Sequence, residues 1–184
     1  MSDINLEANG DGSVAQIGNS GGSQASITGD VTVSGAYVNV STGHPAEDCD
    51  CNQNEAAYPD SATAQIGNGG AYSTGNIGGT VTVAADQGIY VDVEGPHDIV
   101  QIGNGGYQSN ATTSGGVTLI SANGDIWVTT EESGYIQIGN GGYQSNASAS
   151  GNIDVEALNG SINVDTYAPS EDSPDYNQPA DSFI

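Results

Sequence analysis

One short segment of the sequence gathers the side chains that could ligate a metal or form disulfides. Its members are a histidine, three carboxylates and two cysteines, at His44, Glu47, Asp48, Cys49, Asp50 and Cys51. Imidazole and thiolate are ligands that zinc and other transition metals prefer. A Cys-Xaa-Cys pair supplies only two of the four ligands of a usual structural zinc site. The two cysteines could form a disulfide with each other only with strain, because disulfide geometry is specific. The segment therefore predicts either a metal site formed by His44, Asp48, Cys49, Asp50 and Cys51, or disulfides from Cys49 and Cys51 to partners elsewhere.

The other carboxylates do not form a catalytic pattern. Asp92, Glu94 and Asp98 lie close together in sequence, and paired carboxylates can cleave glycosides. Enzymes that use such clusters often add Arg or Lys to stabilise the developing charge. This chain has no Lys or Arg and only two histidines. We therefore expect that the protein is not an enzyme.

The charge of the chain excludes two classes of partner. Its 184 residues include 23 Asp and Glu, which gives a net charge of −23. Nucleic acids and anionic membrane surfaces are bound through Lys and Arg, so neither is expected to bind. Insertion into a bilayer is not expected either, because no apolar run approaches the ~18–20 residues that span one. The carboxylates either bind counter-cations, for which Ca²⁺ is the candidate, or form a solvated acidic surface.

A repeated tetrapeptide, Gln-Ile-Gly-Asn, organises the rest of the chain. It occurs at residues 16–19, 65–68, 101–104 and 137–140, so that successive copies begin 49, 36 and 36 positions apart. The last two copies extend to an identity of eleven residues, at 101–111 and 137–147. Identity at a fixed spacing is the signature of an internal structural repeat. The longer first interval indicates that residues 44–61 are an insertion loop.

Each copy predicts three short strands with period-two alternation of apolar and polar residues. The inward positions of the first strand include Ile17, Ile66, Ile102 and Ile138. Those of the second include Val31, Val81, Val117 and Ile153, and those of the third include Val38, Ile89, Ile126 and Ile162. Stacked copies align these positions into one core that no copy could bury alone.

The predicted fold is therefore all-β: a parallel β-helix, or β-solenoid, of about four coils with ~36-residue repeats. A sandwich or barrel of antiparallel hairpins is the alternative, and the constant period favours the solenoid. Residues 14–164 would form the solenoid, with residues 1–13 as an N-terminal cap or joining segment. Residues 165–184 would form an extended acidic tail that contains proline.

The repeats resemble those of filamentous-haemagglutinin-like bacterial adhesins. The shared pattern is Gln-Ile-Gly-Asn-Gly-Gly, then a Gly-Xaa-Val/Ile-Thr-Val strand and a Gly-Asp-Ile-Xaa-Val strand, over residues 14–164. The resemblance implies right-handed parallel β-helices on secreted chains. Residues 1–7 lack the basic and apolar regions of a cleavable signal peptide. The C-terminal residues 180–184 resemble the uncleaved signal of cargoes exported by one-step ABC-type machinery. An extracellular or cell-surface location is therefore expected.

Two further residue sets predict structural or binding roles. The asparagines Asn19, Asn68, Asn104 and Asn140 share parity with the inward isoleucines, and stacked amides can form a hydrogen-bonded ladder. Tyr90 and Trp127 fall on the outer face of neighbouring coils, where exposed aromatic residues mark interfaces or carbohydrate-binding surfaces. We also assign Phe183 and Ile184 of the tail to an interface.

These features favour one function and leave two alternatives. A short stack exposes unpaired strand edges at both ends, and open edges template pairing with another chain. The lead prediction is a structural subunit of a self-assembling extracellular filament, sheath or matrix, joined head to tail, with other copies of itself as partner. The first alternative is a secreted adhesin or glycan-binding module that uses the Tyr90/Trp127 face. The second is a calcium-dependent exported cargo.

Overall fold

The computed structural model describes residues 1–10, 12–20, 26–43, 61–95, 97–131, 134–146 and 148–167, and the backbone of residues 181–183. Over these residues the chain forms strands and no helix. The strands are β1 (Ile4–Asn9), β2 (Val14–Ile17), β3 (Ile27–Thr28), β4 (Val31–Gly43), β5 (Thr63–Ile66), β6 (Asn76–Gly78), β7 (Val81–Val93), β8 (Ile99–Ile102), β9 (Thr112–Thr113), β10 (Val117–Ser121), β11 (Ile126–Thr130), β12 (Tyr135–Ile138), β13 (Ile153–Ala157), β14 (Ile162–Thr166) and β15 (Asp181–Phe183). The described residues contain no helix long and apolar enough to cross a membrane.

The strands lie in three sheets, and every strand pair in the described part of the chain is parallel. The prediction of an all-β chain of stacked parallel strands is thus confirmed. The antiparallel alternative is wrong, because each strand pairs with the matching segment of the next copy and not with its neighbour in sequence. Parallel pairing requires such long crossover connections.

The largest sheet, sheet A, bends into two limbs. Its upper limb contains the first half of β4 and of β7, then β10 and β13. Its side limb contains β1, the second half of β4 and of β7, then β11 and β14. The bend in β4 coincides with a register shift between Gly35 and Tyr37. β11 and β14 are separate strands that continue the side limb.

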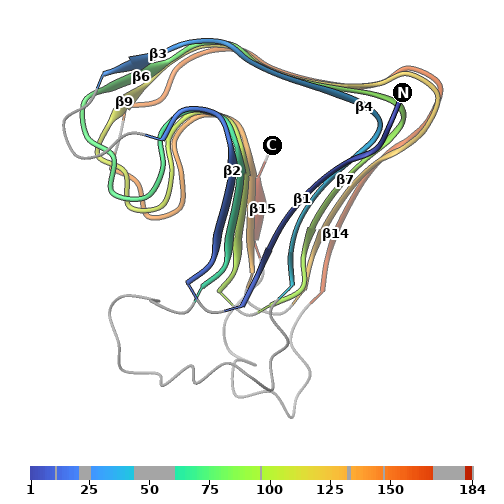
Figure 1. Ribbon diagram of the computed structural model, residues 1–184, viewed down its shortest axis with the longest axis horizontal. Coiled ribbons are helices and arrows are strands. Elements are labelled where there is room, and N and C mark those ends of the chain that lie inside the picture. Colours follow the sequence, from blue (N-terminus) through green and yellow to red (C-terminus); the bar gives the residue numbers. More distant parts are fainter. Residues whose placement is uncertain are drawn as a thin grey trace.

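The two smaller sheets complete the cross-section. Sheet B has the order β2-β5-β8-β12-β15, and sheet C has the order β3-β6-β9. Figure 1 shows sheet B facing the side limb, with sheet C at the far end of the upper limb. The loops between sheets B and C form a lobe beside the outer face of sheet B (Figure 1).

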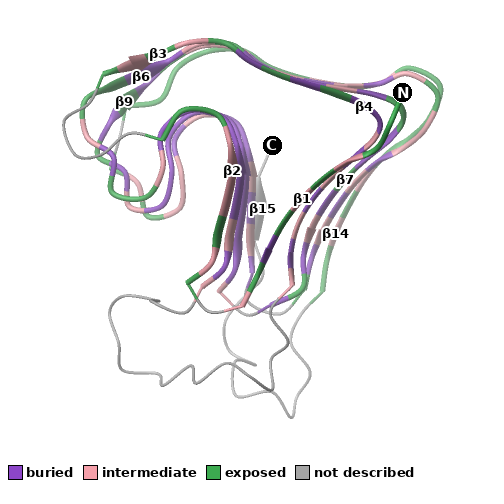
Figure 2. Cartoon of the chain, in the orientation of Figure 1, coloured by how far each residue is buried: buried purple, intermediate pink, exposed green. Residues whose placement is uncertain are grey.

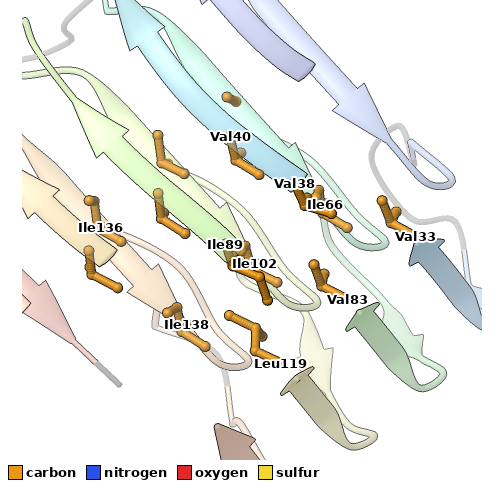
Figure 3. Packing of buried hydrophobic residues seen from close by; sticks show 14 of the residues in the cluster. Val33, Val38, Val40, Ile66, Val83, Ile89, Ile102, Leu119, Ile136 and Ile138 are labelled. Carbon is orange, nitrogen blue, oxygen red and sulfur yellow. The ribbon is translucent and has the colours of Figure 1, made fainter. Parts of the chain in front are cut away.

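Rows of aliphatic side chains between sheet B and the limbs of sheet A form the hydrophobic core (Figure 3). One row joins residues of the side limb in register: Val38 with Ile89, Ile89 with Ile126, and Ile126 with Ile162. The first three of these side chains are fully buried. Exposed residues gather on the first and last strands of the stack, and buried ones lie between (Figure 2). The period-two pattern places these residues inward, as the sequence predicts.

Glycine is required where successive copies approach closely. Gly105 has φ +123°, and a Cβ added there would lie 1.6 Å from the carbonyl oxygen of Gly141. Only glycine adopts such a backbone at this distance, which explains the Gly-Gly pair after the asparagine.

Two strand assignments from the sequence are incomplete. The prediction of three strands per copy misses β3, β6 and β9, whose residues differ in type between copies. Residues 1–13, which the sequence assigns to a cap or joining segment, contain strand β1, which runs from Ile4 to Asn9 and pairs with β4.

Candidate functional site

One end of the stack exposes residues of the type that form the core elsewhere. β13 and β14 are the terminal strands of the two limbs of sheet A in the described part of the chain. Ile153, Ile162 and Val164 are each 44% exposed. Their register partners one strand earlier are all buried: Val117, Ile126 and Val128. This end therefore presents an unpaired parallel edge above an uncovered core.

The opposite end is formed by β1, β2 and the upper-limb half of β4. Val14 of β2 is 70% exposed, and Ile4 and Leu6 of β1 are only partly buried against the core. Within the described residues, sheet A therefore ends in strands with no further partner on either side, and sheet B ends in β2 and β15; all of these strands are parallel.

The hydrogen bonds of β14 identify which of its backbone groups face outward. The Tyr167 N–H donates to the Thr130 carbonyl at 2.8 Å, and the Ile126 N–H donates to the Ser161 carbonyl at 2.9 Å. In a parallel strand the backbone groups of alternate residues point to opposite neighbours. The amides and carbonyls of Ile162, Val164 and Thr166 consequently point away from β11 along the open edge.

The outer face of the side limb carries the aromatic pair expected from the sequence. Trp127 pairs in register with Tyr90, and Asn39 and Asn163 continue the row on either side. Tyr90 is 39% exposed, and its ring lies 6.1 Å from the ring of Tyr37. The row forms a ridge of aromatic side chains flanked by amides.

A second aromatic cluster follows the Gly-Gly pairs of the repeat, such as Gly105-Gly106 and Gly141-Gly142. The rings of Tyr107 and Tyr143 stack at 6.0 Å with an interplanar angle of 19°, and Tyr72 meets Tyr107 edge-on at 5.7 Å. Tyr107 is buried. These contacts join successive copies, as aromatic pairs in this geometry do.

Carboxylates and hydroxyls alternate along the next outward row of the side limb. In register order the residues are Glu7, Ser41, Asp92, Thr129 and Asp165. Burial raises the pKa of Asp92 to about 6, and the nearby charges of Glu94 and Glu131 add to this effect. A carboxylate that is costly to ionise is thus held in the middle of the row.

An open depression beside this row is lined by Glu7, Asn9, Gly43, Glu94 and Glu131. Within the described residues, no three His, Cys, Asp or Glu side chains are grouped so that they could hold a metal ion. The depression therefore carries concentrated negative charge without a ligand set that is already assembled.

The asparagines of the repeated tetrapeptide lie in a row, buried at Asn68 and Asn104 in the middle of the stack, and fasten each copy to the previous one. The Asn104 amide nitrogen donates to the carbonyls of Gly79 at 2.8 Å and Ser114 at 3.1 Å. Its Oδ1 accepts the backbone N–H of Asn68 at 3.2 Å. Asn68 and Asn140 make the equivalent bonds. Asn19 and Asn68 also join directly, with Asn19 Nδ2 donating to Asn68 Oδ1 at 2.9 Å.

The glutamines of the tetrapeptide have a role that the alternation pattern did not reveal. Gln65 and Gln101 are buried, although they point away from the core. The Gln65 Nε2 donates to the carbonyls of Gly103 and Gly105 in the next copy. The retention of glutamine in all four copies was the signal for this role.

The remaining predicted residues fall in two groups. His44, Asp48, Cys49, Asp50, Cys51 and Ile184 lie outside the described residues, and of Phe183 only the backbone, in β15, is described. Asp92, Glu94 and Asp98 are described, and Asp98 is buried, where a carboxylate oxygen accepts the Ala62 N–H at 2.8 Å. This bond gives Asp98 a structural role.

No protein-family model, curated protein or solved structure matches this chain.

Proposed function

We propose that the protein is a structural subunit of a self-assembling extracellular filament, sheath or matrix. In this proposal residues 14–164 form a β-solenoid of four coils, each about 36 residues long and related to the adhesin repeats that they resemble. Copies join head to tail through the ends of the solenoid. The contact is heterologous, so it continues without closing.

The observation that carries the proposal is the exposure of core-type residues at β13 and β14. A solenoid that ends in solution normally covers its last coil with a polar cap. Here Ile153, Ile162 and Val164 are each 44% exposed beside unpaired backbone groups. An open edge of this kind favours pairing with another strand. The absence of Lys and Arg from the sequence also supports an extracellular role, because trypsin-like proteases find no cleavage site.

Electron microscopy of the purified protein at neutral pH, with and without Ca²⁺, tests the proposal. We expect uniform filaments that thicken or lengthen when Ca²⁺ screens the net charge of −23. Discrete small particles in both conditions would contradict it. Filaments that form only with Ca²⁺, together with folding that requires Ca²⁺, would favour a calcium-dependent exported cargo.

The aromatic ridge supports a second candidate function, glycan binding by a secreted adhesin. Tyr90 and Trp127 pair in register on an exposed sheet face, flanked by the amides of Asn39 and Asn163. Aromatic faces bordered by polar groups suit sugars, which have both apolar and hydroxyl surfaces. Quenching of Trp127 fluorescence by neutral polysaccharides, and its loss in Tyr90→Ala, would support this candidate. Unchanged fluorescence across a polysaccharide panel would exclude it for those sugars.

A further inference from the structure

Two parts of the cross-section contain the same number of strands. The side limb runs β1, β4, β7, β11 and β14, and sheet B runs β2, β5, β8, β12 and β15. Each therefore has five levels, where a level is one strand position along the stack. The upper limb runs β4, β7, β10 and β13, and sheet C with the Thr113–Ala149 bridge also has four levels. The two five-level parts face each other across the core (Figure 1).

From this equality we infer the joint of the filament: β14 of one copy pairs with β1 of the next, and β15 pairs with β2 of the next. The inference rests on the proposed function, since it specifies the contact that the proposed filament uses. A single translation along the stack by five strand spacings brings both pairs together. No shear is needed, because the side limb gains its fifth strand, β1, at one end of the stack and sheet B gains its fifth strand, β15, at the other.

Register and side-chain pattern agree with this joint. β1 and β14 occupy the same limb, and their sequences Ile4-Asn5-Leu6-Glu7 and Ile162-Asn163-Val164-Asp165 match in polarity at every position. The side limb pairs Ile4 with Val38 and Ile126 with Ile162, so the joint places Ile162 opposite Ile4 of the next copy. Both isoleucines then continue the inward row of the core.

The outward groups at the joint are also complementary. The outward-pointing amides and carbonyls of Ile162, Val164 and Thr166 meet the free side of β1. Just before β1, the Ser2 carbonyl accepts the Ala36 N–H, so the backbone groups of this parity are directed at β4. Within one copy the Asn39 amide donates to the Asn5 side-chain oxygen. The joint places Asn163 of one copy beside Asn5 of the next, on the side opposite Asn39, so the row of amides continues across the joint.

One pair at the joint is repulsive. Within a copy each carboxylate of the outward row is separated from the next by Ser41 or Thr129. The joint removes this separation and places Asp165 directly beside Glu7 of the next copy. Like charges directly opposite on neighbouring strands destabilise the pairing. Assembly therefore strengthens when the charge of this pair is screened or removed.

The joint also fixes the axial repeat. Five strand spacings of about 4.8 Å give about 24 Å per subunit. The upper limb has only four levels, so β13 stays one strand away from β4 of the next copy. A joint in which β13 paired directly with β4 would instead give about 19 Å.

The axial repeat of the filaments, measured by helical reconstruction or fibre diffraction, tests the joint. A repeat of about 24 Å supports it and one of about 19 Å overturns it. If no filament forms under any condition, the proposed function itself fails. That outcome is distinct from a filament with another repeat, which would contradict this joint alone.

Proline substitutions on the two open edges test the same joint independently. Val164→Pro on β14 removes an N–H that points away from β11, so the fold of the subunit is retained. We expect it to raise the critical concentration for assembly about tenfold or more, because a buried partner loses its bond. Val155→Pro is the control on β13, the edge that the joint leaves unpaired. It also removes an outward-pointing N–H, but it should change the critical concentration for assembly little. The reverse order of effects would overturn the inference.

A charge variant completes the test. Glu7→Gln removes the repulsion with Asp165 and should lower the critical concentration about two- to fivefold. Asp86→Asn is the matched control, because Asp86 lies on β7 in the middle of the stack and bonds to Asn123. It changes the net charge equally without touching the joint. Equal effects of both variants would show that only net charge matters and would contradict the Asp165–Glu7 contact.

Discussion

Replacement of Asn104 by alanine should remove more stability than replacement of any asparagine at an end of the stack. The side chain of Asn104 is fully buried and makes three hydrogen bonds, to the Gly79 carbonyl, the Ser114 carbonyl and the Asn68 N–H. Asn104→Ala leaves all three backbone groups without these bonds in a dry interior. Each such group costs about 1–3 kcal/mol, so the free energy of unfolding should fall by about 3–9 kcal/mol. This is a large part of the ~5–15 kcal/mol that stabilises a typical domain.

Asn140→Ala is the matched control. Asn140 makes the same three kinds of bond, to Gly115 and Ser150 carbonyls and the Asn104 N–H. It is only half-buried, so water can replace part of these bonds, and the expected loss is about 1–2 kcal/mol. Urea unfolding followed by far-UV circular dichroism measures both variants. Losses of stability that agree within about 0.5 kcal/mol would show that burial of the asparagine side chain does not set its contribution.

Two other perturbations have predicted signs. Gly105→Ala should destabilise the fold by several kcal/mol or prevent folding, because the added Cβ would overlap the Gly141 carbonyl oxygen. Gly70→Ala is the control, because no atom lies within 4 Å of its added Cβ. It should cost only about 1–2 kcal/mol, from its positive φ alone. Thermal melts compare the two, and equal midpoints would show that the close approach is relieved at no cost. The pKa of Asp92 is raised from 3.8 to about 6, so the folded state holds this proton more tightly and loses stability as pH rises from about 4 to 6. After allowance for solvent screening, Asp92→Asn should raise stability at pH 7 by about 1 kcal/mol and flatten the dependence on pH, as urea midpoints at several pH values would show; an unchanged pH profile would contradict this.

The sequence predicted the part of the fold that depends on periodicity. Inward rows such as Val38, Ile89 and Ile126 follow from alternation, because a strand with one face on a core can hold apolar residues only on that face. The fixed spacing of the tetrapeptide predicted that the strands stack in parallel, since each copy needs its neighbour to cover its core.

Alternation could not predict which polar residues are buried. Gln65 and Gln101 lie on the outer face of sheet B, which a half-buried strand would expose, but the lobe of loops covers this face. Their burial is possible because the Gly103 and Gly105 carbonyls accept the Gln65 amide protons. The glutamine and the carbonyls that accept its protons belong to different copies of the repeat, so the pattern within one copy could not reveal these hydrogen bonds.

The open ends and head-to-tail joining were predicted in outline, but the number of strands in each part was not. A short repeat array implies unpaired edges, but the number of levels in each part depends on where β1 and β15 pair. β1 pairs with β4 and β15 pairs with β12, which gives the side limb and sheet B their fifth strand. The pairing of these end strands cannot be inferred from the period of the repeat, since both lie outside it.

Sedimentation velocity over a wide range of protein concentration shows whether the open ends of this solenoid join. We expect a critical concentration above which a subunit-sized species is replaced by a fast-sedimenting boundary. The critical concentration should fall as ionic strength rises, because salt screens the acidic charge. A single subunit-sized species at all concentrations and ionic strengths would contradict the claim that the open ends of this solenoid join.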